Sequence, residues 1–357
     1  MRIALLFPNN TYTSPYLKYY TQLLEKENLE YDLIIWDRAG IKEEGCLAFS
    51  QKENRKSIYT RASGFFKYRN FIIQKINENE YDKIIVFSCQ LGILLSRYIT
   101  KKYKNNFLLD IRDYSKVLPF FNNRFRKLVL NANTVCISSN GFKEWLPKNR
   151  DYLLSHNIDI KLIENRLKNV SNNKTFFNDQ ILNIDTIGQI KDYNSDKEVI
   201  NQLKNDKRFH MTFIGFGPTL EALKQYINEN KVSNVHFYGP YKKEEEKQLL
   251  AKTDFINILI SRNKFNNGVT SNRLYLSALL NIPCIVNAQT IEQRKIIEKY
   301  KFGIIVDKYE ELPNKLIEYK ETFNNEVFID NCLAFLNNVK KDYKIFENRL
   351  INFITEK

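Results

Sequence analysis

Residues 267–286, NGVTSNRLYLSALLNIPCIV, combine a turn, a helix pattern and a short apolar strand. The predicted helix begins with four side chains that can donate hydrogen bonds to an anion, namely Thr270, Ser271, Asn272 and Arg273. No aspartate or glutamate occurs between residues 255 and 291. A helix start attracts anions through its dipole and its N–H groups, and a guanidinium adds positive charge. The stretch therefore predicts an anion site, with a well-capped structural helix as the alternative.

Three other junctions in the second half of the chain place glycine between an apolar strand and a helix. Gly188 and Lys191 lie in DTIGQIKD, Gly215 and Gly217 lie in FIGFGP, and Gly239 lies in HFYGPY. Glycine permits positive φ and close approach to the backbone, and the following helix offers N–H groups to a phosphate. The sequence contains neither a dinucleotide-binding fingerprint nor a P-loop. Each junction, taken alone, is equally compatible with ordinary turn chemistry.

The first half of the chain carries a polar cluster, DIRDY, in which Asp110, Arg112 and Asp113 end an apolar strand. Strand ends are common positions for catalytic or binding groups, but an ion pair of this kind can equally be structural. His156, in SHN, precedes a polar segment that we interpret as a linker. A histidine at this position can serve in proton transfer or hydrogen bonding, although a lone histidine is more often structural.

Residues 52–79 are both basic and aromatic, with apolar side chains at helical spacing. Arg61, Phe65, Lys67 and Arg69 belong to this segment. Basic amphipathic helices of this composition can lie on an anionic membrane surface. The alternative is a helix that packs on a core and leaves a solvated basic face.

The chain has 357 residues, a net charge of +14 and a pI of about 9.3. This charge is compatible with nucleic acid, an anionic membrane, phosphorylated substrates or simply a solvated basic surface. The five cysteines and three histidines are widely spaced and form no CxxC, which favours a reducing compartment and argues against disulfides and metal sites. The apolar run at residues 1–10 is too short for a signal peptide, and no run is long enough to span a bilayer. We therefore expect a soluble or peripheral protein.

Apolar strand patterns alternate with helix patterns along the chain, as in RIALLFP, YDLIIWD, YDKIIVFSC, NFLLDIRD and NTVCISS in the first half. The second half continues with ILNIDTIGQI, FHMTFIG, NVHFYG, FINILI, PCIVN and GIIVD. Such alternation predicts parallel sheets covered by helices. We predict an α/β fold with two doubly wound, Rossmann-like domains facing a central cleft. Ligands of such sheets bind at the carboxyl ends of the strands.

Several segments together resemble the glycosyltransferases of the GT-B fold, and especially glycosyltransferase family four. The segments that carry the resemblance are FLLDIRDY, NTVCISSNGFKEWLP, SHN, DTIGQIKD, FIGFGP, VHFYGPY and SNRLYLSALLNIPCIV. The last is similar to the family helix that binds the diphosphate of a nucleotide sugar at its start. The family contains retaining enzymes of bacterial capsule, O-antigen and exopolysaccharide synthesis, and the likeness covers nearly the whole chain.

The resemblance implies a division of labour between the domains. Residues 1–165 would bind the acceptor, residues 166–330 would bind the nucleotide sugar, and a helix in residues 331–357 would pack back on the first domain. The reaction would be retaining transfer of a sugar onto a polyprenyl-diphosphate-linked glycan. The protein would then work in the cytoplasm, as a peripheral protein on the inner face of the plasma membrane. No DxD motif is positioned for a metal, so we expect no metal or other cofactor.

The resemblance and the motifs together define the predicted site. The predicted catalytic residues are Asp110, Arg112, His156, Lys191 and Arg273. The predicted donor-binding residues are Gly188, Gln189, Lys191, Gly215, Gly217, Gly239, Pro240, Tyr241, Gly268, Thr270, Ser271, Asn272 and Arg273. The predicted acceptor or membrane contacts are Arg61, Phe65, Lys67 and Arg69. We hypothesise that Lys191 and Arg273 stabilise the departing diphosphate.

The sequence departs from the family at two carboxylates. The family has a Glu-x7-Glu pair that contacts the sugar and the ribose, and the matching positions here are Gly268 and Leu276. In the first phosphate loop, Gln189 replaces the usual arginine. The alternative function is a non-catalytic binding or scaffold protein of the same fold. The hypothesis of a nucleic-acid-binding protein rests on charge alone, because the sequence contains no RNA- or DNA-binding motif. We therefore expect no nucleic-acid partner.

Overall fold

The structure is a computed structural model that describes residues 1–14, 16–52, 58–169, 176–177, 179–261, 263 and 266–356. The chain divides into two compact units. The first unit is Met1–Asn157 with Lys341–Lys357, and the second is Ile158–Lys340. The boundary thus lies at residue 157, where the sequence predicts 165. The predicted linker falls partly on residues 170–175 and 178, which lie outside the described residues.

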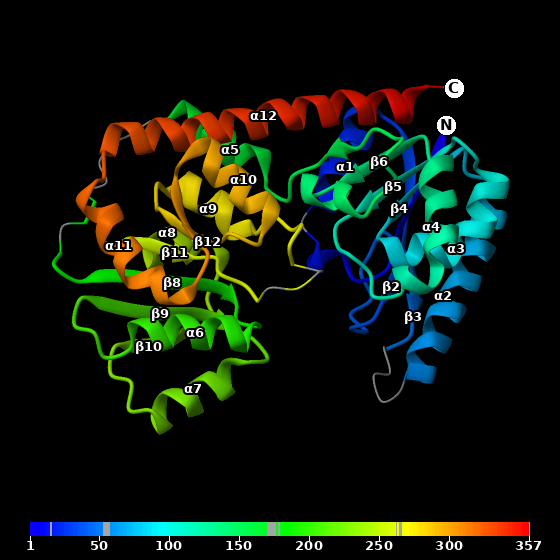
Figure 1. Cartoon of the computed structure of the whole chain (residues 1–357). Helices are drawn as coiled ribbons and strands as arrows, with labels where there is room; N and C mark the ends of the chain where they lie inside the picture. The colour runs from blue at the N-terminus through cyan, green and yellow to red at the C-terminus, as the bar shows by residue number, and fades with distance from the viewer. Residues whose placement is uncertain are drawn as a thin grey trace. The chain divides into compact units, whose positions relative to one another are not determined.

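The first unit is built on a parallel sheet of strand order β3-β2-β1-β4-β5-β6-β7 (Figure 1). Its strands are β1 (Arg2–Phe7), β2 (Glu30–Asp37), β3 (Cys46–Ser50), β4 (Lys83–Phe87), β5 (Phe107–Ile111), β6 (Thr134–Ile137) and β7 (Leu153–Leu154). The central strands are apolar almost without interruption because both faces of a parallel sheet are covered. Parallel pairing also places all the carboxyl ends at one edge of the sheet.

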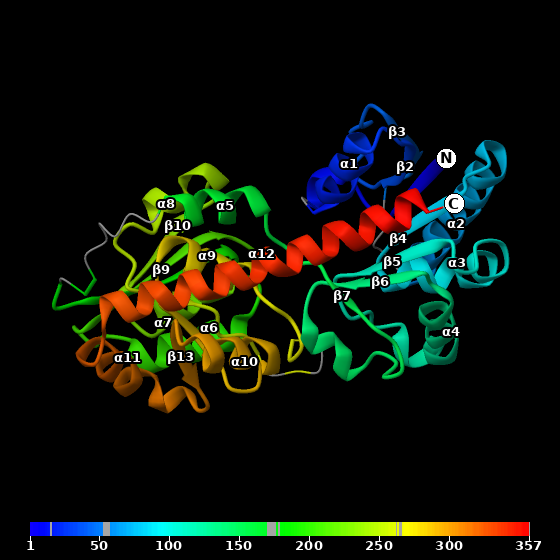
Figure 2. The same cartoon turned by 90° about the horizontal axis from the view of Figure 1, so that it is seen from above.

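Helices cover both faces of this sheet. On one face, α1 (Leu17–Lys26) and the end of α12 (Asn325–Thr355) pack on alternate residues of the strands, among them Ile3, Leu5 and Phe7. On the other face, α2 (Ile58–Asn79), α3 (Cys89–Lys102) and α4 (Leu118–Asn131) lie side by side (Figure 2). The end of α12 belongs to the first unit because Phe346, Leu350 and Phe353 recur at helical spacing and are buried there.

The second unit is built on a parallel sheet of strand order β10-β9-β8-β11-β12-β13. Its strands are β8 (Leu182–Gln189), β9 (Phe209–Phe216), β10 (Val235–Gly239), β11 (Phe255–Asn257), β12 (Cys284–Asn287) and β13 (Gly303–Val306). The strand order reverses at β8, since β9 lies on one side and β11 on the other. A reversal of this kind is where ligands bind in open α/β sheets, at the carboxyl ends.

The second sheet is also covered on both faces. One core contains α6 (Tyr193–Leu203), α7 (Leu220–Glu229) and α11 (Leu312–Glu321). The other contains α5 (Ile160–Lys168), α8 (Glu246–Leu249), α9 (Asn272–Leu280), α10 (Ile291–Tyr300) and the first part of α12. Each unit is therefore a doubly wound α/β domain, and the predicted fold class is confirmed in this respect.

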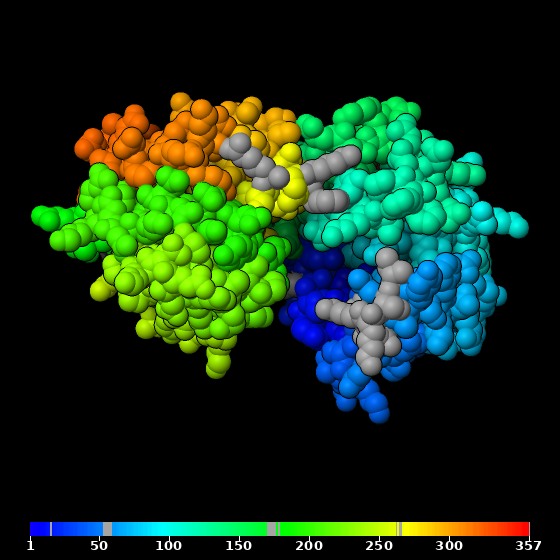
Figure 3. Space-filling model, turned by 60° about the horizontal axis from the view of Figure 1, so that its bottom comes forward, coloured from blue at the N-terminus to red at the C-terminus, as the bar shows by residue number. Residues whose placement is uncertain are grey.

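Several elements were not expected from the sequence. These are β3, β7, α4, α5 and α11, and the segment NGFKEWL contains the 3-10 helix η2 (Asn140–Glu144). The C-terminal helix begins at Asn325, before the predicted residue 331. The surface of the segments around α3 and α4 is visible in cyan to green in Figure 3. Among the described helices, none combines the length and apolar character needed to cross a membrane.

Candidate functional site

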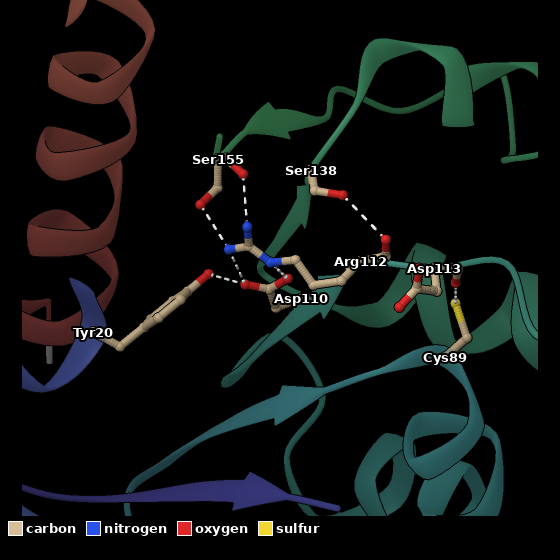
Figure 4. Close-up of polar contacts among 7 residues, drawn as sticks. All are labelled: Tyr20, Cys89, Asp110, Arg112, Asp113, Ser138 and Ser155. Carbon is tan, nitrogen blue, oxygen red and sulfur yellow. Dashed lines mark hydrogen bonds and ion pairs between the residues drawn. The ribbon is translucent and has the colours of Figure 1, made fainter. Parts of the chain in front are cut away.

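In the first unit, the predicted residues Asp110 and Arg112 form a buried ion pair (Figure 4). Arg112 donates Nε to Asp110 Oδ1 at 2.7 Å and an η nitrogen to Oδ2 at 2.8 Å. Tyr20 donates its hydroxyl to the same carboxylate, and the remaining Arg112 donors reach the carbonyl and hydroxyl of Ser155, both at 2.8 Å. The two residues thus join β5, α1 and the segment after β7.

The environment of this pair favours a structural role. The Asp110 side chain is fully buried, and 9% of the Arg112 side chain is exposed. Tyr16 stacks on the guanidinium, with 4.1 Å between the ring centroid and Arg112 Cζ. Burial raises the pKa of Tyr16 to about 12, and the Asp110 charge adds to the increase, so the Tyr16 phenol stays neutral. The contacts favour the structural alternative over catalysis, and a catalytic role of the pair stays a prediction.

Two more predicted polar residues of the first unit have structural contacts. His156 lies 2.9 Å from Asp342 of α12, between Nε2 and Oδ2. Asp113 accepts a hydrogen bond from the Cys89 thiol through its backbone carbonyl. The sequence predicts proton or hydrogen-bond work for His156, and the structure shows it bonded to the C-terminal helix. Its role in catalysis stays a prediction.

The glycines of the second unit lie where strands β8 and β9 end side by side. A Cβ on Gly215 would come within 2.0 Å of the Gly188 carbonyl oxygen, and one on Gly217 within 1.8 Å of the Ile190 carbonyl oxygen. Gly215 also has φ of +137°, which L residues rarely adopt. These glycines are therefore required by packing of the two strand ends, whether or not a ligand approaches them.

The predicted residues Gln189, Lys191, Tyr241 and Arg273 converge near these glycines. Arg273 donates to the carbonyls of Ile187, Asn257 and Gln189, at the ends of β8 and β11. The Tyr241 hydroxyl lies 3.9 Å from the position of a Cβ on Gly188 and donates to Glu246 at 3.2 Å. Lys191 is exposed and has no bonded partner among the described residues. Lys191 is thus an exposed cation at the end of β8, whereas Arg273 holds the backbone of this edge through its bonds to three carbonyls.

The start of α9 is capped by the protein itself. Ser271 Oγ accepts from the Arg273 amide at 3.3 Å, and the Ser271 amide donates to Gln293 Oε1 at 2.9 Å. The Leu274 amide donates to the Ser271 carbonyl. Gly268, Thr270 and Asn272 are part of the same segment and have further contacts. These bonds favour the alternative of a capped structural helix, and a diphosphate at this helix start stays a prediction.

The absence of acids in residues 255–291 does not make the site free of carboxylates. Asp192, after β8, accepts from the amide and hydroxyl of Ser261 and caps α6 through the Ser195 amide. Asp196 is buried on α6, close enough to Arg273 for their charges to interact. Burial raises the Asp196 pKa to about 7, while Arg273 opposes the rise. The absence of acids is therefore local to the sequence, because Asp192 and Asp196, which are distant in sequence, lie near this edge in the fold.

The remaining donor-site predictions lie after β10. Gly239 has φ of +91°, and Pro240 is exposed. The structure also reveals Phe216, the last residue of β9, whose side chain is 64% exposed between Gly215 and Gly217. The segment FIGFGP is singled out in the sequence only for its glycines, so the exposure of Phe216 is known from the structure alone. An exposed aromatic at a strand end is suited to stack on a planar ligand.

The predicted membrane contacts on α2 are not all exposed. Phe65 packs on Trp36 with 5.1 Å between ring centroids, and Arg69 donates Nε to the Leu94 carbonyl. Arg61 and Lys67 are exposed. The packing of Phe65 follows the alternative of a core-facing helix with a solvated basic face. The exposed aromatics of this helix are Tyr59 at 84% and Phe66 at 59%.

The described residues hold no group of three or more His, Cys, Asp or Glu side chains that could bind a metal ion. The five cysteines are free thiols. Four of them, Cys89, Cys136, Cys284 and Cys332, are buried. Burial raises the pKa of the Cys284 thiol to about 12 and that of Cys46 to about 11, so neither is an activated nucleophile.

Two doubly wound α/β units in one chain define the class of fold, which matches that of solved GT-B structures. No protein-family model matches the chain, and no curated protein matches it either. The chain is similar to solved structures over nearly its whole length. HepE of Anabaena, solved in complex with UDP, has 12% identity and a TM-score of 0.68, with 98% of this chain and 99% of HepE covered.

Two further structures have comparable likeness. Sucrose-phosphate synthase of Thermosynechococcus elongatus has 11% identity and a TM-score of 0.68, with 98% of each chain covered. The lipopolysaccharide outer core galactosyltransferase WaaB, in its apo form, has 15% identity and a TM-score of 0.64, with 96% of this chain and 100% of WaaB covered. At these identities the likeness establishes the fold.

Proposed function

We propose that the protein is a glycosyltransferase that uses a nucleoside diphosphate sugar as donor. The observation that carries the proposal is the cluster at the carboxyl edge of the second sheet, in a GT-B fold whose neighbour HepE was solved with UDP, glucose and UDP-glucose. Lys191, Phe216 and the glycine ends of β8 and β9 lie at this edge. They offer a cation for phosphate, an aromatic for a base and close backbone approach.

The proposed reaction is retaining transfer to an acceptor hydroxyl. The bond between the anomeric carbon and the diphosphate oxygen breaks, and a bond from that carbon to the acceptor oxygen forms on the same face. The acceptor proton passes to a donor phosphate oxygen, and the nucleoside diphosphate leaves. Lys191 would stabilise the charge that develops on the leaving diphosphate, an electrostatic role that requires no metal.

Arg273 would act by positioning in this scheme. Its three bonds to the carbonyls of Ile187, Gln189 and Asn257 hold the ends of β8 and β11 in place. The family carboxylate positions do not contribute, since Gly268 has no side chain and Leu276 packs against the core. Contacts to the sugar and ribose would come from other groups.

The proposed acceptor is a glycan linked to a polyprenyl diphosphate at the inner face of the plasma membrane, as part of bacterial surface polysaccharide synthesis. Support comes from exposed aromatic and basic side chains of the first unit. Tyr59 and Phe66 of α2 and Phe120 of α4, 82% exposed, lie among lysines and arginines. Residues 114–143 contain no acid at all. Such a surface is complementary to anionic lipid head groups.

A matched pair of variants tests the donor site. Lys191→Ala removes the exposed cation at the carboxyl edge, whereas Lys207→Ala removes an exposed lysine that precedes β9, at the amino edge. A ligand that binds only the native state raises the melting temperature. UDP, GDP, CMP and TDP sugars are screened by thermal shift. We expect one class of nucleotide sugar to raise the melting temperature of the parent protein and of the Lys207 variant by similar amounts. The same sugar should raise the melting temperature of the Lys191 variant much less.

The alternative is a non-catalytic binding or scaffold protein of the same fold. The missing Glu-x7-Glu carboxylates favour it. Nucleotide-sugar binding without hydrolysis or transfer would support the scaffold, and release of nucleoside diphosphate would exclude it.

A further inference from the structure

A pocket lies in the first unit, at the amino ends of β6 and β7. Its volume is about 460 Å³. Thr134 and Leu153, which begin the two strands, line it together with Ile345 and Arg349 of α12. Asp110, Arg112 and Ser155 lie at the opposite, carboxyl edge of the same sheet. The pocket is therefore separate from every site residue discussed above.

The pocket gathers positive charge from three elements. Arg150 precedes β7 and Arg349 is on α12, and both line the pocket. Arg126 of α4 lies close enough for its charge to act on Tyr152, which also lines the pocket. Asp151 is the one acid among the lining residues. Like charges held together at the surface repel one another, and a bound anion would relieve that repulsion.

Asp151 opposes only part of this positive charge, because the arginines outnumber it. Neither Arg126 nor Arg349 has a bonded partner among the described residues. Burial lowers the pKa of Arg150, and the Arg349 charge adds to this decrease, whereas Tyr152 and Asp151 oppose it. Tyr152 stays neutral, because burial raises its pKa to about 12 against the opposing charges of Arg150 and Arg126.

Arg150 is held in place before any ligand arrives. It donates to the carbonyls of Ala132 at 2.6 Å and Asn133 at 2.7 Å, at the end of α4. Its buried Nε has no hydrogen-bond partner in the described structure. A buried donor without a partner costs stability, and an acceptor oxygen in the pocket would satisfy it. A fixed guanidinium also loses little freedom when it binds an anion.

We infer that this pocket binds a phosphate-bearing anion, either a small phosphorylated compound or a phospholipid head group. The anion lies between Arg150 and Arg349, with Arg126 contributing charge from α4. Ile345 is 60% exposed beside it, which suits a ligand with an apolar part. Ile345 and Arg349 are four residues apart on one face of α12. They come three and seven residues, respectively, after Asp342, which contacts His156. A bound anion therefore ties α12 to the first unit from the other edge of the sheet.

The test uses the full chain with inorganic pyrophosphate as the soluble probe. Hydrogen exchange of peptides locates the binding. We expect added pyrophosphate to protect residues 131–135, 150–153 and 343–350, independently of any protection near Lys191. Arg349→Ala should weaken pyrophosphate binding at these peptides about tenfold, the loss of one charge-assisted bond. Lys344→Ala removes an exposed charge from the same helix outside the pocket and should change the affinity less than twofold.

Vesicles distinguish the two sources of phosphate. Sedimentation with phosphatidylglycerol vesicles, compared with phosphatidylcholine vesicles, reports on a head group. If Arg349→Ala reduces sedimentation with the anionic vesicles and Lys344→Ala does not, the source is lipid; if only pyrophosphate binding responds, the source is a soluble phosphate. The inference is overturned if both variants behave alike in both assays, or if pyrophosphate protects only peptides of the second unit. Far-ultraviolet circular dichroism verifies that the variants are folded.

Discussion

At the scale of single residues, the charged side chains predicted to be catalytic make several hydrogen bonds within the protein. Asp110 and Arg112 were recognisable as charged groups at a strand end and Arg273 as one at a helix start, and the structure places them there. Their partners could not be predicted, because Ser155 and the carbonyls at the ends of β8 and β11 are distant in sequence. Lys191 differs from these residues, because it is exposed and has no bonded partner among the described residues.

The buried ion pair of the first unit gives the first prediction. Asp110→Asn leaves the Arg112 charge buried with a neutral partner, and loss of one member of such a pair costs about 3–5 kcal/mol. Both tryptophans, Trp36 and Trp145, belong to the first unit, so their fluorescence during urea unfolding reports its stability. Glu78→Gln, which breaks the exposed pair with Lys75, is the control and should have no measurable effect. Equal stability of the Asp110 variant and the parent would contradict the account.

Asp196 gives a prediction about pH. Its pKa is about 7 in the folded unit and about 3.9 in an unfolded chain, so the folded state holds the proton more tightly. The stability that protonated Asp196 supports is complete below about pH 4 and is lost as pH rises through 7. Asp196→Asn should therefore stabilise the second unit at pH 8, by on the order of 2–4 kcal/mol, and change little near pH 4. Calorimetry at both pH values checks this, and a destabilised variant at pH 8 would refute it.

At the scale of elements, most strands could be predicted, whereas the short strands β3 and β7 and several helices could not. Buried parallel strands read as continuous apolar runs, which is why β1, β4, β5 and β8 stand out in the sequence. The segment of α4, LPFFNNRFRKLVLN, begins with proline and exposed aromatics and has a non-helical residue, Phe121. The apolar residues of α4 therefore do not follow a regular helical spacing, which is why the sequence did not predict this helix.

The C-terminal helix provides the prediction at this scale. Lys83 of β4 is buried and donates Nζ to the carbonyls of Phe353 and Glu356, the latter at 2.6 Å, which satisfies the end of α12. Lys83→Met keeps the apolar stem and removes both bonds. We expect residues 350–356 to exchange amide hydrogens at least tenfold faster, since each charged bond contributes about 1.5–3 kcal/mol. Lys101→Met, at the exposed end of α3, is the control, and unchanged exchange in both variants would contradict this capping role.

At the scale of the whole molecule, two α/β units follow from the alternation of strands and helices, and the structure bears this out. The division at residue 157 was less predictable, because α5 packs with α9 and its residue Ile163 enters the core of the second unit. Function at this scale rests on the edge where β8 and β9 end. The glycines and Lys191 of this edge could be predicted from the sequence. The contributions of Asp192, Asp196 and Phe216 could be recognised only from the structure.

Glycosyl transfer itself is the central claim, and donor turnover tests it most directly. The full chain is incubated with the nucleotide sugar that stabilises it, with and without membrane lipids that carry polyprenyl-diphosphate glycans, and released nucleoside diphosphate is measured. The account predicts release that increases with the lipids, persists in Lys207→Ala and falls at least tenfold in Lys191→Ala. Tight donor binding with no release under any of these conditions would contradict the account and leave a binding protein of the same fold.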